Sequence, residues 1–395
     1  MANTGRQTTE YTLMHKDIPV ATVLLDNRGI IRAVHDVNAP DHLPLGLSCT
    51  HGIPGADAVN SWWLSRGIPS SRQGMRPVCQ ALNLHSTPPM LKRSLGLSLT
   101  DQYWIRPYGS GMSWKDASFF TNPFSEDIGD MMFGFNFKAK RDICFNTPDI
   151  ACSGNLKKRW KAEGSTRWLI KAGSYPGCQE PVNECIASAI ADLLGIPHVT
   201  YSLYWHDGLP YCVCKDFISA DTELIPACPI LETRKLSPGG TPYKPYDFFI
   251  QCCTSLGIPD PRPFLDRMIV FDYIIANEDR HYENFGFIRD ADTLEWLGPA
   301  PLYDSGYSLG SRMSSYAMRH QKPRCMPFLC DPDIQLNFVS DYSWLDPGAL
   351  DSIPDIICSA FAGLPEGFIS TDKRDAILDT TRERLDSLKR RILHL

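Results

Sequence analysis

The stretch Ile275–Ile288, IANEDRHYENFGFI, places three acidic residues, two asparagines and a histidine between apolar segments. Within it, Asp279 and Asn284 stand five positions apart, and a further acid, Asp304, follows in the segment PLYDSG. An apolar helical segment precedes the loop and a short apolar strand follows it, so the loop is held at both ends. We therefore expect Asp279 and Asn284 to face one cavity, with Asp304 brought back beside Asn284 by the hairpin that follows.

These residue types suit one kind of chemistry. One aspartate free to accept a proton, with an asparagine and a second aspartate supplying oxygen ligands, is what Mg²⁺-assisted phosphoryl transfer requires. Such a reaction is catalysed mainly by positioning the reactants and neutralising charge. Asp and Asn are also common in turns and at helix caps, so the loop alone leaves an ordinary polar turn as an alternative.

A second pair of residues lies upstream. Lys171 closes the apolar strand RWLIK, and Glu184 follows thirteen residues later, in the first turn of a predicted helix that should pack on this strand. A strand Lys paired with a helix Glu, with the ammonium directed at ATP phosphates, is the arrangement of protein kinases. Separately, a Lys can extend to solvent from a strand end and a Glu favours a helix N-terminus. Their order upstream of the acidic loop favours the kinase interpretation.

The composition is that of a soluble globular protein. The chain has 395 residues, which is too long for one ordinary compact core. Of its residues, 43% are hydrophobic and 21% are charged. A net charge of −6 argues against a surface that coats nucleic acid. The cysteines lack the paired spacing of a zinc site or a disulfide framework, so we expect reduced core thiols. No signal-like apolar segment and no long apolar run occurs, so we expect a cytoplasmic protein without a membrane span.

Turn residues and apolar periodicity predict the order of the elements. A hairpin is expected around Asp26–Gly29, and a helix after Pro181 that stops at Gly195. The other predicted elements are a short helix in 57–69, two strands ending at Lys171 with a turn at Glu163–Gly164, a hairpin around Asp207–Gly208, helices in 243–257 and 263–277, a hairpin that turns near 290–292, and a tail helix capped by Thr371.

Taken together, these segments resemble the HipA-like serine/threonine kinases. The resemblance rests on FDYIIANEDRHYENFGFI followed by PLYDSG, on WLIKAGS followed by NECIASAIADLLGIP, and on SGNLKK. It implies an α+β fold of the kinase-like, PI3/4-kinase-like type with two lobes and, in addition, an N-terminal accessory region. These would be a β-rich N-terminal accessory region (1–125), a small β-rich nucleotide-binding lobe with one helix (126–220), and a mostly helical lobe with the catalytic loop and metal site (221–395).

The resemblance implies roles for the residues of the acidic loop and its neighbour. Asp279 would be the base that orients the substrate hydroxyl, and Asn284 and Asp304 would bind Mg²⁺. His281 would support the catalytic loop, although a purely structural histidine is an equal alternative. The other acids of the loop, Glu278 and Glu283, are expected to be dispensable.

It also implies an ATP site. Lys171 would pair with the phosphates and Glu184 would hold Lys171. The loop with Ser153, Gly154 and Lys158 would face the phosphates, and Ser153 is a candidate for autophosphorylation. The sequence departs from the eukaryotic kinase pattern here, because the G-x-G-x-x-G motif is absent and the loop offers only Gly154.

The segment CVCKDF, from Cys212 to Phe217, would carry the chain out of the sheet and present its backbone to adenine, with Cys214 and Phe217 at the nucleotide. The implied activity is transfer of the γ-phosphate of ATP to a Ser or Thr hydroxyl of a protein, in the role of a toxin of a toxin–antitoxin pair. Because the sequence shows no helix-turn-helix or strongly basic module, no direct nucleic-acid binding is expected, and an antitoxin partner would be a separate chain.

Two other functions remain open. A lipid kinase acting on phosphoinositides would share the D-R-H…N plan, although the acidic pI and the lack of an evident basic membrane face argue against it. A non-catalytic kinase-like scaffold that binds nucleotide or a partner is the other. The segment SGYSLGSRMSSYAMRHQKP follows Asp304 and carries Arg312, Arg319, His320 and Lys322. It could receive a phosphate or an acidic substrate, or it is an ordinary exposed loop.

Overall fold

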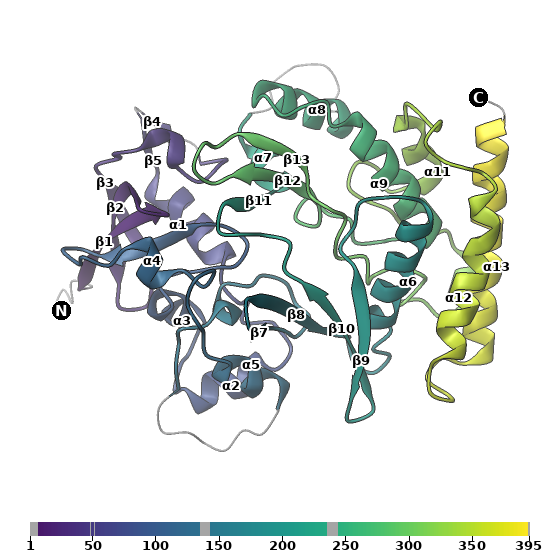
Figure 1. The fold of residues 1–395 in the computed structure, drawn as a ribbon, viewed down its shortest axis with the longest axis horizontal. Helices are drawn as coiled ribbons and strands as arrows, with labels where there is room; N and C mark the ends of the chain where they lie inside the picture. The colour runs from purple at the N-terminus through teal and green to yellow at the C-terminus, as the bar shows by residue number, and fades with distance from the viewer. Residues whose placement is uncertain (1–6, 48, 51, 135–142, 235–243, 394–395) are drawn as a thin grey trace, which may run out of the picture.

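The computed structural model describes residues 7–47, 49–50, 52–134, 143–234 and 244–393. In Figure 1 the chain passes from an N-terminal sheet at the left, through a second sheet at the centre, to helices at the right. The long helix α13 (Thr371–Leu393) forms the right-hand edge. No helix in these ranges is long and apolar enough to cross a bilayer. Residues 1–6, which bear on our expectation about a secretion signal, lie outside them.

The N-terminal region is built on a four-stranded antiparallel sheet. Its strands, in spatial order, are β3 (Ile31–His35), β2 (Ile18–Asp26), β1 (Thr8–His15) and β6 (Tyr103–Pro107). The β2–β3 turn closes because the buried Asp26 carboxylate accepts hydrogen bonds from the N–H groups of Arg28 (2.9 Å) and Ile30 (3.1 Å).

Short elements surround this sheet, and most of its apolar side chains form one core with those of α1, α2, α3 and α5. These elements are β4 (Cys49–Thr50), β5 (Ile53–Pro54), α1 (Ala56–Ser65), α2 (Met75–Ala81), α3 (Pro88–Arg93), α4 (Trp114–Ala117), α5 (Asp127–Phe133), and the 3₁₀ turns Pro40–His42 and Pro148–Ile150.

A second antiparallel sheet carries Lys171. Its strands, in spatial order, are β7 (Lys158–Glu163), β8 (Thr166–Ala172), β10 (Leu209–Lys215) and β9 (Tyr201–His206). The two-residue turn between β9 and β10 is Asp207-Gly208, and both residues have the positive φ that tight hairpins require. Helix α6 (Glu180–Leu193) contacts this sheet, and Figure 1 shows it between the β9–β10 hairpin and α12 (Ile353–Ala362).

The remainder is a small sheet and a helical core. The sheet contains β11 (Thr222–Pro226), β12 (Gly286–Asp290) and β13 (Trp296–Pro299). The helices not yet named are α7 (Ala227–Glu232), α8 (Pro245–Ser255), α9 (Arg262–Ile275), α10 (Ser315–His320) and α11 (Pro332–Gln335), with the 3₁₀ turns Leu336–Phe338 and Ala349–Ser352. Helix α9 is buried nearly all round, as its continuous apolar sequence predicts, and lies within the main core.

Most of the predicted elements are confirmed, as is a mixed fold of helices and sheets. Five of the described strands were not predicted. These are β1, β6 and β11, which pair with partners distant in sequence, and the two-residue strands β4 and β5, which pair with each other. The predicted cap of the tail helix was wrong, since the side chain of Ser370, not Thr371, accepts the hydrogen bond from the N–H of Lys373 at 3.3 Å. The division into two lobes and the boundaries at 125 and 220 stay predictions.

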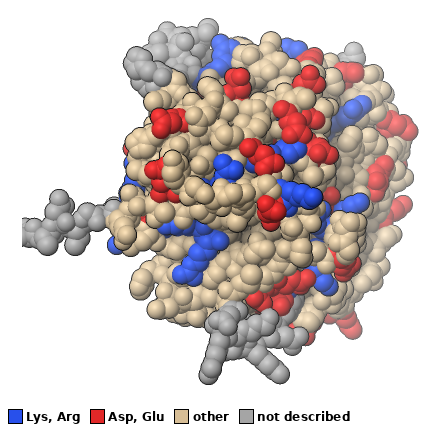
Figure 2. Space-filling model, turned by 60° about the vertical axis from the view of Figure 1, so that its left-hand side comes forward, with Lys and Arg blue, Asp and Glu red and all other residues tan. Residues whose placement is uncertain are grey.

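The surface carries charges of both signs. On the face that Figure 2 shows, Lys and Arg side chains are interspersed with Asp and Glu side chains, and neither sign gathers into one continuous patch. This pattern agrees with the modest net charge of −6 and differs from the single-signed stripe that nucleic-acid-coating proteins display.

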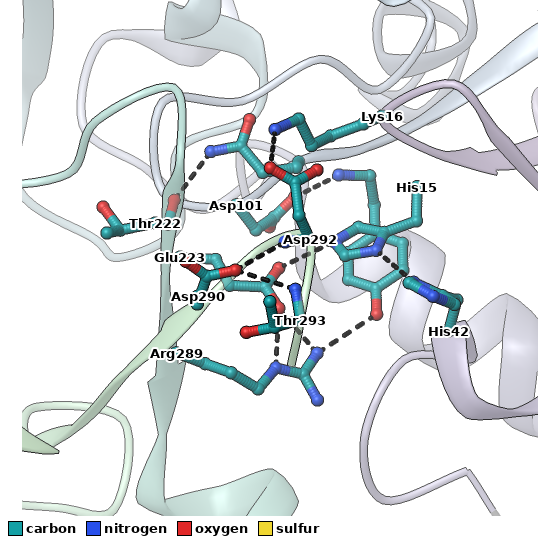
Figure 3. A network of polar contacts seen from close by, with 12 residues as sticks. His15, Lys16, His42, Asp101, Thr222, Glu223, Arg289, Asp290, Asp292 and Thr293 are labelled. Atoms are coloured by element: carbon teal, nitrogen blue, oxygen red, sulfur yellow. Dashed lines mark hydrogen bonds and ion pairs between the residues drawn. The ribbon is translucent and has the colours of Figure 1, made fainter. Parts of the chain in front are cut away.

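A buried polar network joins the N-terminal sheet to the small sheet (Figure 3). The His15 ring lies between His42, with Nδ1 to Nδ1 at 2.8 Å, and Glu223, with Nε2 to Oε2 at 3.2 Å. On its other side, Glu223 accepts a hydrogen bond from Arg289 Nε at 2.7 Å, and Arg289 also approaches the hydroxyl of Tyr103 at 3.5 Å. Because His15 and Glu223 are fully buried, this contact fixes how the two parts of the chain are docked.

Replacing Glu223 by Gln should destabilise the protein at neutral pH. The change leaves the buried Arg289 guanidinium without its counter-charge, which typically costs about 3–5 kcal/mol. Urea unfolding checks this, with Glu163→Gln as the control, because Glu163 is 62% exposed in a surface ion pair.

The same comparison has a predicted pH dependence. Burial raises the pKa of Glu223, but the hydrogen bond from His15 and the charge of Arg289 outweigh it, and the net pKa lies below its ordinary value. Stability from such a group is present above the ordinary Glu pKa and is lost as pH falls through the lowered one. The gap between wild type and Glu223→Gln should therefore narrow in acid. A gap that widens in acid contradicts this assignment.

Candidate active site

The ammonium of Lys171 joins three parts of the chain. Lys171 Nζ donates to Glu184 Oε1 on α6 and to Asp304 Oδ1, the latter at 2.5 Å. The side chains of Lys171 and Glu184 are 5% and 2% exposed, whereas that of Asp304 is 33% exposed. The predicted pairing of Lys171 with Glu184 is present, and the same cation also holds the acid that follows the β12–β13 hairpin.

The charges in this cluster reinforce one another. Burial alone would lower the pKa of Lys171, but Asp304 and then Glu184 outweigh it and hold the pKa well above its ordinary value. Burial would raise the pKa of Asp304, yet Lys171 and then Lys158 hold it well below its usual range. Burial raises the pKa of Glu184, Lys171 offsets this only in part, and the nearby charge of Asp304 raises the pKa further. Asp304 is therefore an anion that faces an opening.

The loop after α9 positions Asp279 and Asn284 together. Helix α9 ends at Ile275, and Ala276 adopts a left-handed conformation with φ of 49° that turns the chain into the loop. The Asn284 side-chain N–H donates to the backbone carbonyl of Asp279 at 2.8 Å, which explains the spacing of five residues. No hydrogen bond from the described residues reaches the Asp279 carboxylate. Burial raises its pKa, and nearby Asp304 raises it further.

Arg280, to which the sequence analysis gave no role, ties this loop to Asp304. Its fully buried guanidinium pairs with Asp272 of α9, with Nε to Oδ2 at 2.9 Å. It also donates to the backbone carbonyls of Asn284, at 2.7 Å, and Tyr303. The sequence did contain a signal for this contact: Arg280 lies between Asp279 and Asn284 and follows an acid of a buried helix. A buried Arg requires such a partner.

Helix α6 contacts the segment after Asp304 directly. The N–H of Ser305 donates to Glu184 Oε2 at 2.8 Å, and Asn183 Nδ2 donates to the carbonyls of Gly306 (2.9 Å) and Ser308 (2.7 Å). A Cβ on Gly306 would lie 3.1 Å from Glu180 Cβ. The glycine of the DSG motif therefore permits close approach between this segment and α6.

The predicted phosphate-facing loop lies beside the same cluster. Gly154 has a φ of 95°, and a Cβ there would meet Lys158 Nζ at 2.8 Å. Burial lowers the pKa of Lys158, while Cys152 and then Asp304 raise it in part, so Lys158 is close enough to sense Asp304. Ser153 is exposed. The structure thus brings Lys158, Lys171 and Asp304 together.

Arg72, from the N-terminal region, holds this loop through hydrogen bonds. Its side chain is 2% exposed and donates to three successive carbonyls, those of Cys152, Ser153 (2.8 Å) and Gly154 (2.8 Å). The N–H of the neighbouring Gln73 also donates to the Asn155 carbonyl at 3.4 Å. Nothing in the local sequence around Arg72 distinguishes it from an ordinary surface arginine, so the sequence analysis gave it no role.

The remaining predicted positions occupy different environments. Cys214 lies on β10 with its thiol buried, and burial raises the pKa of the thiol to about 12. Phe217, just after β10, is 37% exposed and stacks on Tyr303 with ring centroids 5.9 Å apart, next to Asp304. His281 accepts a hydrogen bond at Nδ1 from the N–H of Glu283 at 3.2 Å, a contact within the loop. Their roles toward a nucleotide stay predictions.

The sequence of this part of the chain matches a known family. Residues 140–325 match the HipA-like C-terminal domain, a range that contains every predicted site residue. The chain carries a HipA-like C-terminal domain. The loop with Asp279 and Asn284, the Lys171 strand and Asp304 all lie inside this domain. No curated protein matches the sequence.

One solved structure is similar in fold to nearly the whole chain. HipA in the complex of the Shewanella oneidensis MR-1 toxin–antitoxin system HipA, HipB and its operator DNA is similar in fold, with a TM-score of 0.56 and 16% identity, over 96% of this chain and 97% of that one. The Helicobacter pylori proinflammatory kinase CtkA gives a TM-score of 0.46 at 19% identity, over 60% of this chain and 94% of that one.

The residues present in the HipA-like domain fit a Mg²⁺ ion. Asp304 is anionic and partly exposed, with Oδ1 engaged by Lys171. Asn284 uses its side-chain N–H to hold Asp279, and among the described residues nothing donates to its amide oxygen. Two oxygen donors, one of them charged, are the ligands that Mg²⁺ takes from protein when substrate phosphates and water complete its shell.

The Arg72 contact predicts a measurable change in the loop. Replacing Arg72 by Met removes the donors to three carbonyls, so the backbone amides of 152–157 should exchange hydrogen for deuterium faster than in wild type. Mass spectrometry of the exchange reports this. Arg76→Met is the control, because Arg76 lies only four residues further along the chain, at the start of α2, but is exposed. Equal exchange in both variants would show that Arg72 does not hold the loop.

Proposed function

We propose that this protein is a HipA-like kinase, which transfers the γ-phosphate of ATP, with Mg²⁺, to a Ser or Thr hydroxyl of a protein, its own Ser153 included. The observation that carries the proposal is the placement of Lys171 between Glu184 and Asp304, beside a loop that holds Asp279 and Asn284 together. A purely structural ion pair would not account for a third charged partner, a partly exposed Asp304 and an unengaged carboxylate on Asp279.

In this proposal, each residue has a separate task. Lys171 directs its ammonium to the α- and β-phosphates, and Glu184 holds it there. The Asp279 carboxylate, which no described residue engages, accepts the hydrogen bond of the substrate hydroxyl and orients it toward the phosphorus. Asp304 and Asn284 would hold Mg²⁺, and the bound ion would neutralise charge on the phosphates.

The nucleotide would lie between the sheet and the helical core. Lys158 and the backbone of the loop at Ser153 and Gly154 would face the phosphates, since Lys158 is near Asp304. The chain from Cys214 to Phe217 would contact adenine through its backbone, because it leaves the Lys171 sheet beside Tyr303. His281 would support the loop that carries Asp279.

We further propose a cytoplasmic toxin with an antitoxin as a separate chain. The solved HipA structure of similar fold is a complex with HipB and operator DNA, which supports a partner of this kind. The mixed charge of the face in Figure 2 favours a protein as the direct partner of this chain rather than nucleic acid.

Incubation with labelled ATP and Mg²⁺ tests the activity. Asp279→Asn and Asp304→Asn should each reduce phosphate transfer, to the chain itself or to an added protein, by at least about a hundredfold. Glu283→Gln is the matched control, because Glu283 is an exposed acid of the same loop and should retain activity. Labelling of wild type no greater than that of the two Asp variants would refute the kinase assignment.

The pH dependence of transfer should respond to Arg312. Burial raises the pKa of Asp279, and the charges of His281 and Arg312 lower it. A base must be ionised, so activity is lost as pH falls through its pKa. Arg312→Gln removes a positive charge, raises that pKa and should move the acid limb of kcat/KM to higher pH. Arg324→Gln, an exposed position of the same segment, should leave the limb in place. A shift to lower pH for Arg312→Gln would contradict the role of Asp279.

A further inference from the structure

A cavity lies between the segment that follows Asp304, the end of α9 and α13. It has a volume of about 370 Å³ and is bounded by Gly310, Met313 and 318–323 of that segment, by the end of α9 at Tyr273 and Ala276, and by α13. The volume falls within the range of small-molecule sites in proteins. None of the predicted nucleotide-binding or catalytic residues lines it, so this cavity is separate from the candidate active site.

Two cations of the segment after Asp304, Arg319 and Lys322, line the cavity and are already neutralised. Arg319 Nη1 pairs with Asp372 at 2.8 Å, and Lys322 Nζ pairs with Asp333 at 2.6 Å. Arg312 of the same segment is not among the residues that line the cavity. The segment therefore offers the cavity no unbalanced Lys or Arg charge.

Arg384 of α13 is different. Its Nε donates to the carbonyl of Ile274 at 3.3 Å and its Nη2 donates to Thr381 Oγ1 at 3.0 Å, but no carboxylate in the described ranges lies within ion-pair distance. Glu383, exposed at the rim, acts on it only from a longer range. Burial lowers the pKa of this guanidinium to about 10, and Tyr273 and then Glu383 offset the effect only in part. A guanidinium has five N–H donors, so donors remain for a ligand.

The rest of the lining suits an apolar body. Met313, Met318 and Pro323 contribute apolar surface, and methionine sulfur makes favourable contacts with aromatic rings. The Tyr273 and Ser387 hydroxyls lie on the same wall as Arg384. An arginine that shares a cavity with hydroxyl groups and apolar side chains is a pattern by which proteins bind small organic anions.

We propose that this cavity is a binding site for a small organic anion, in which Arg384 pairs with a phosphate or carboxylate and the methionine-lined wall receives its apolar part. The occupant would contact α13, the end of α9 and the segment after Asp304 at once. It would supply the counter-charge that Arg384 lacks.

Calorimetric titration of the full chain tests the site directly. The probes are phenyl phosphate and benzoate, which carry the two candidate anionic groups. Phenol, which has the ring without the anionic group, and inorganic phosphate, which has an anionic group without the ring, are the two half-ligand controls. We expect saturable binding of at least one of the first two, at least tenfold tighter than either half. The stronger of the two identifies the anionic group. Absence of saturable binding by both would overturn the proposal.

Variants assign the binding to the cavity. Arg384→Gln should weaken binding at least tenfold, whereas Arg382→Gln, an exposed arginine of the same helix paired with Asp379 at 3.7 Å, should not change it. Ser387→Phe, at a half-buried lining position, should block the cavity and guards against a folding defect of the first variant. Asp304→Asn should keep full affinity. Equal affinity in wild type, Arg384→Gln and Ser387→Phe, or loss in Asp304→Asn alone, would refute the assignment. Because the readout is binding, the result does not depend on kinase activity.

Discussion

The structure depends most on one ammonium group held between two carboxylates. Lys171 lies on a strand, Glu184 on a helix and Asp304 on a loop 133 residues further along the chain, and the three meet in a largely buried position. Taking such charges out of water is expensive, and replacing them with apolar residues is often neutral or stabilising. A cluster of this kind therefore has to be explained by what it positions and not by the stability that it adds.

The cluster is also unbalanced, with one cation between two anions. The charges of Lys158 and Arg280 compensate in part, because both lower the pKa of Asp304. Under the proposed function, this imbalance is useful. A cationic metal would meet a preformed negative group, while Lys171 remains protonated to meet the phosphates. The Lys and the Asp keep each other charged at neutral pH, so neither needs to be ionised when substrate binds.

Local sequence was sufficient where contacts are short in range. The spacing of Asp279 and Asn284 reflects one backbone hydrogen bond, and the hairpins follow from their turn residues. The pairing of Lys171 with Glu184 also followed, because strand and helix are consecutive. The local sequence could not reveal the contacts of Arg72, whose partners lie about eighty residues away. Nor could it reveal the contact between Glu223 and His15, which are separated by 208 residues. Buried polar contacts of that range leave no periodic pattern, since each partner alone looks like a surface residue.

The hydrogen bonds from Arg72 to the loop at 152–154 show that the region matched by sequence and the region that holds this loop in place are not the same. The sequence kinship begins at residue 140, but a side chain that fixes the loop inside that kinship comes from before it. The residues that match the family and the residues that fix the conformation of the loop therefore cover different ranges of the chain. A fragment cut at the start of the matching region would inherit the loop without its anchor. The N-terminal region therefore helps to hold the loop at 152–154, and a substitution in that region can alter the loop without changing any residue of the matching domain.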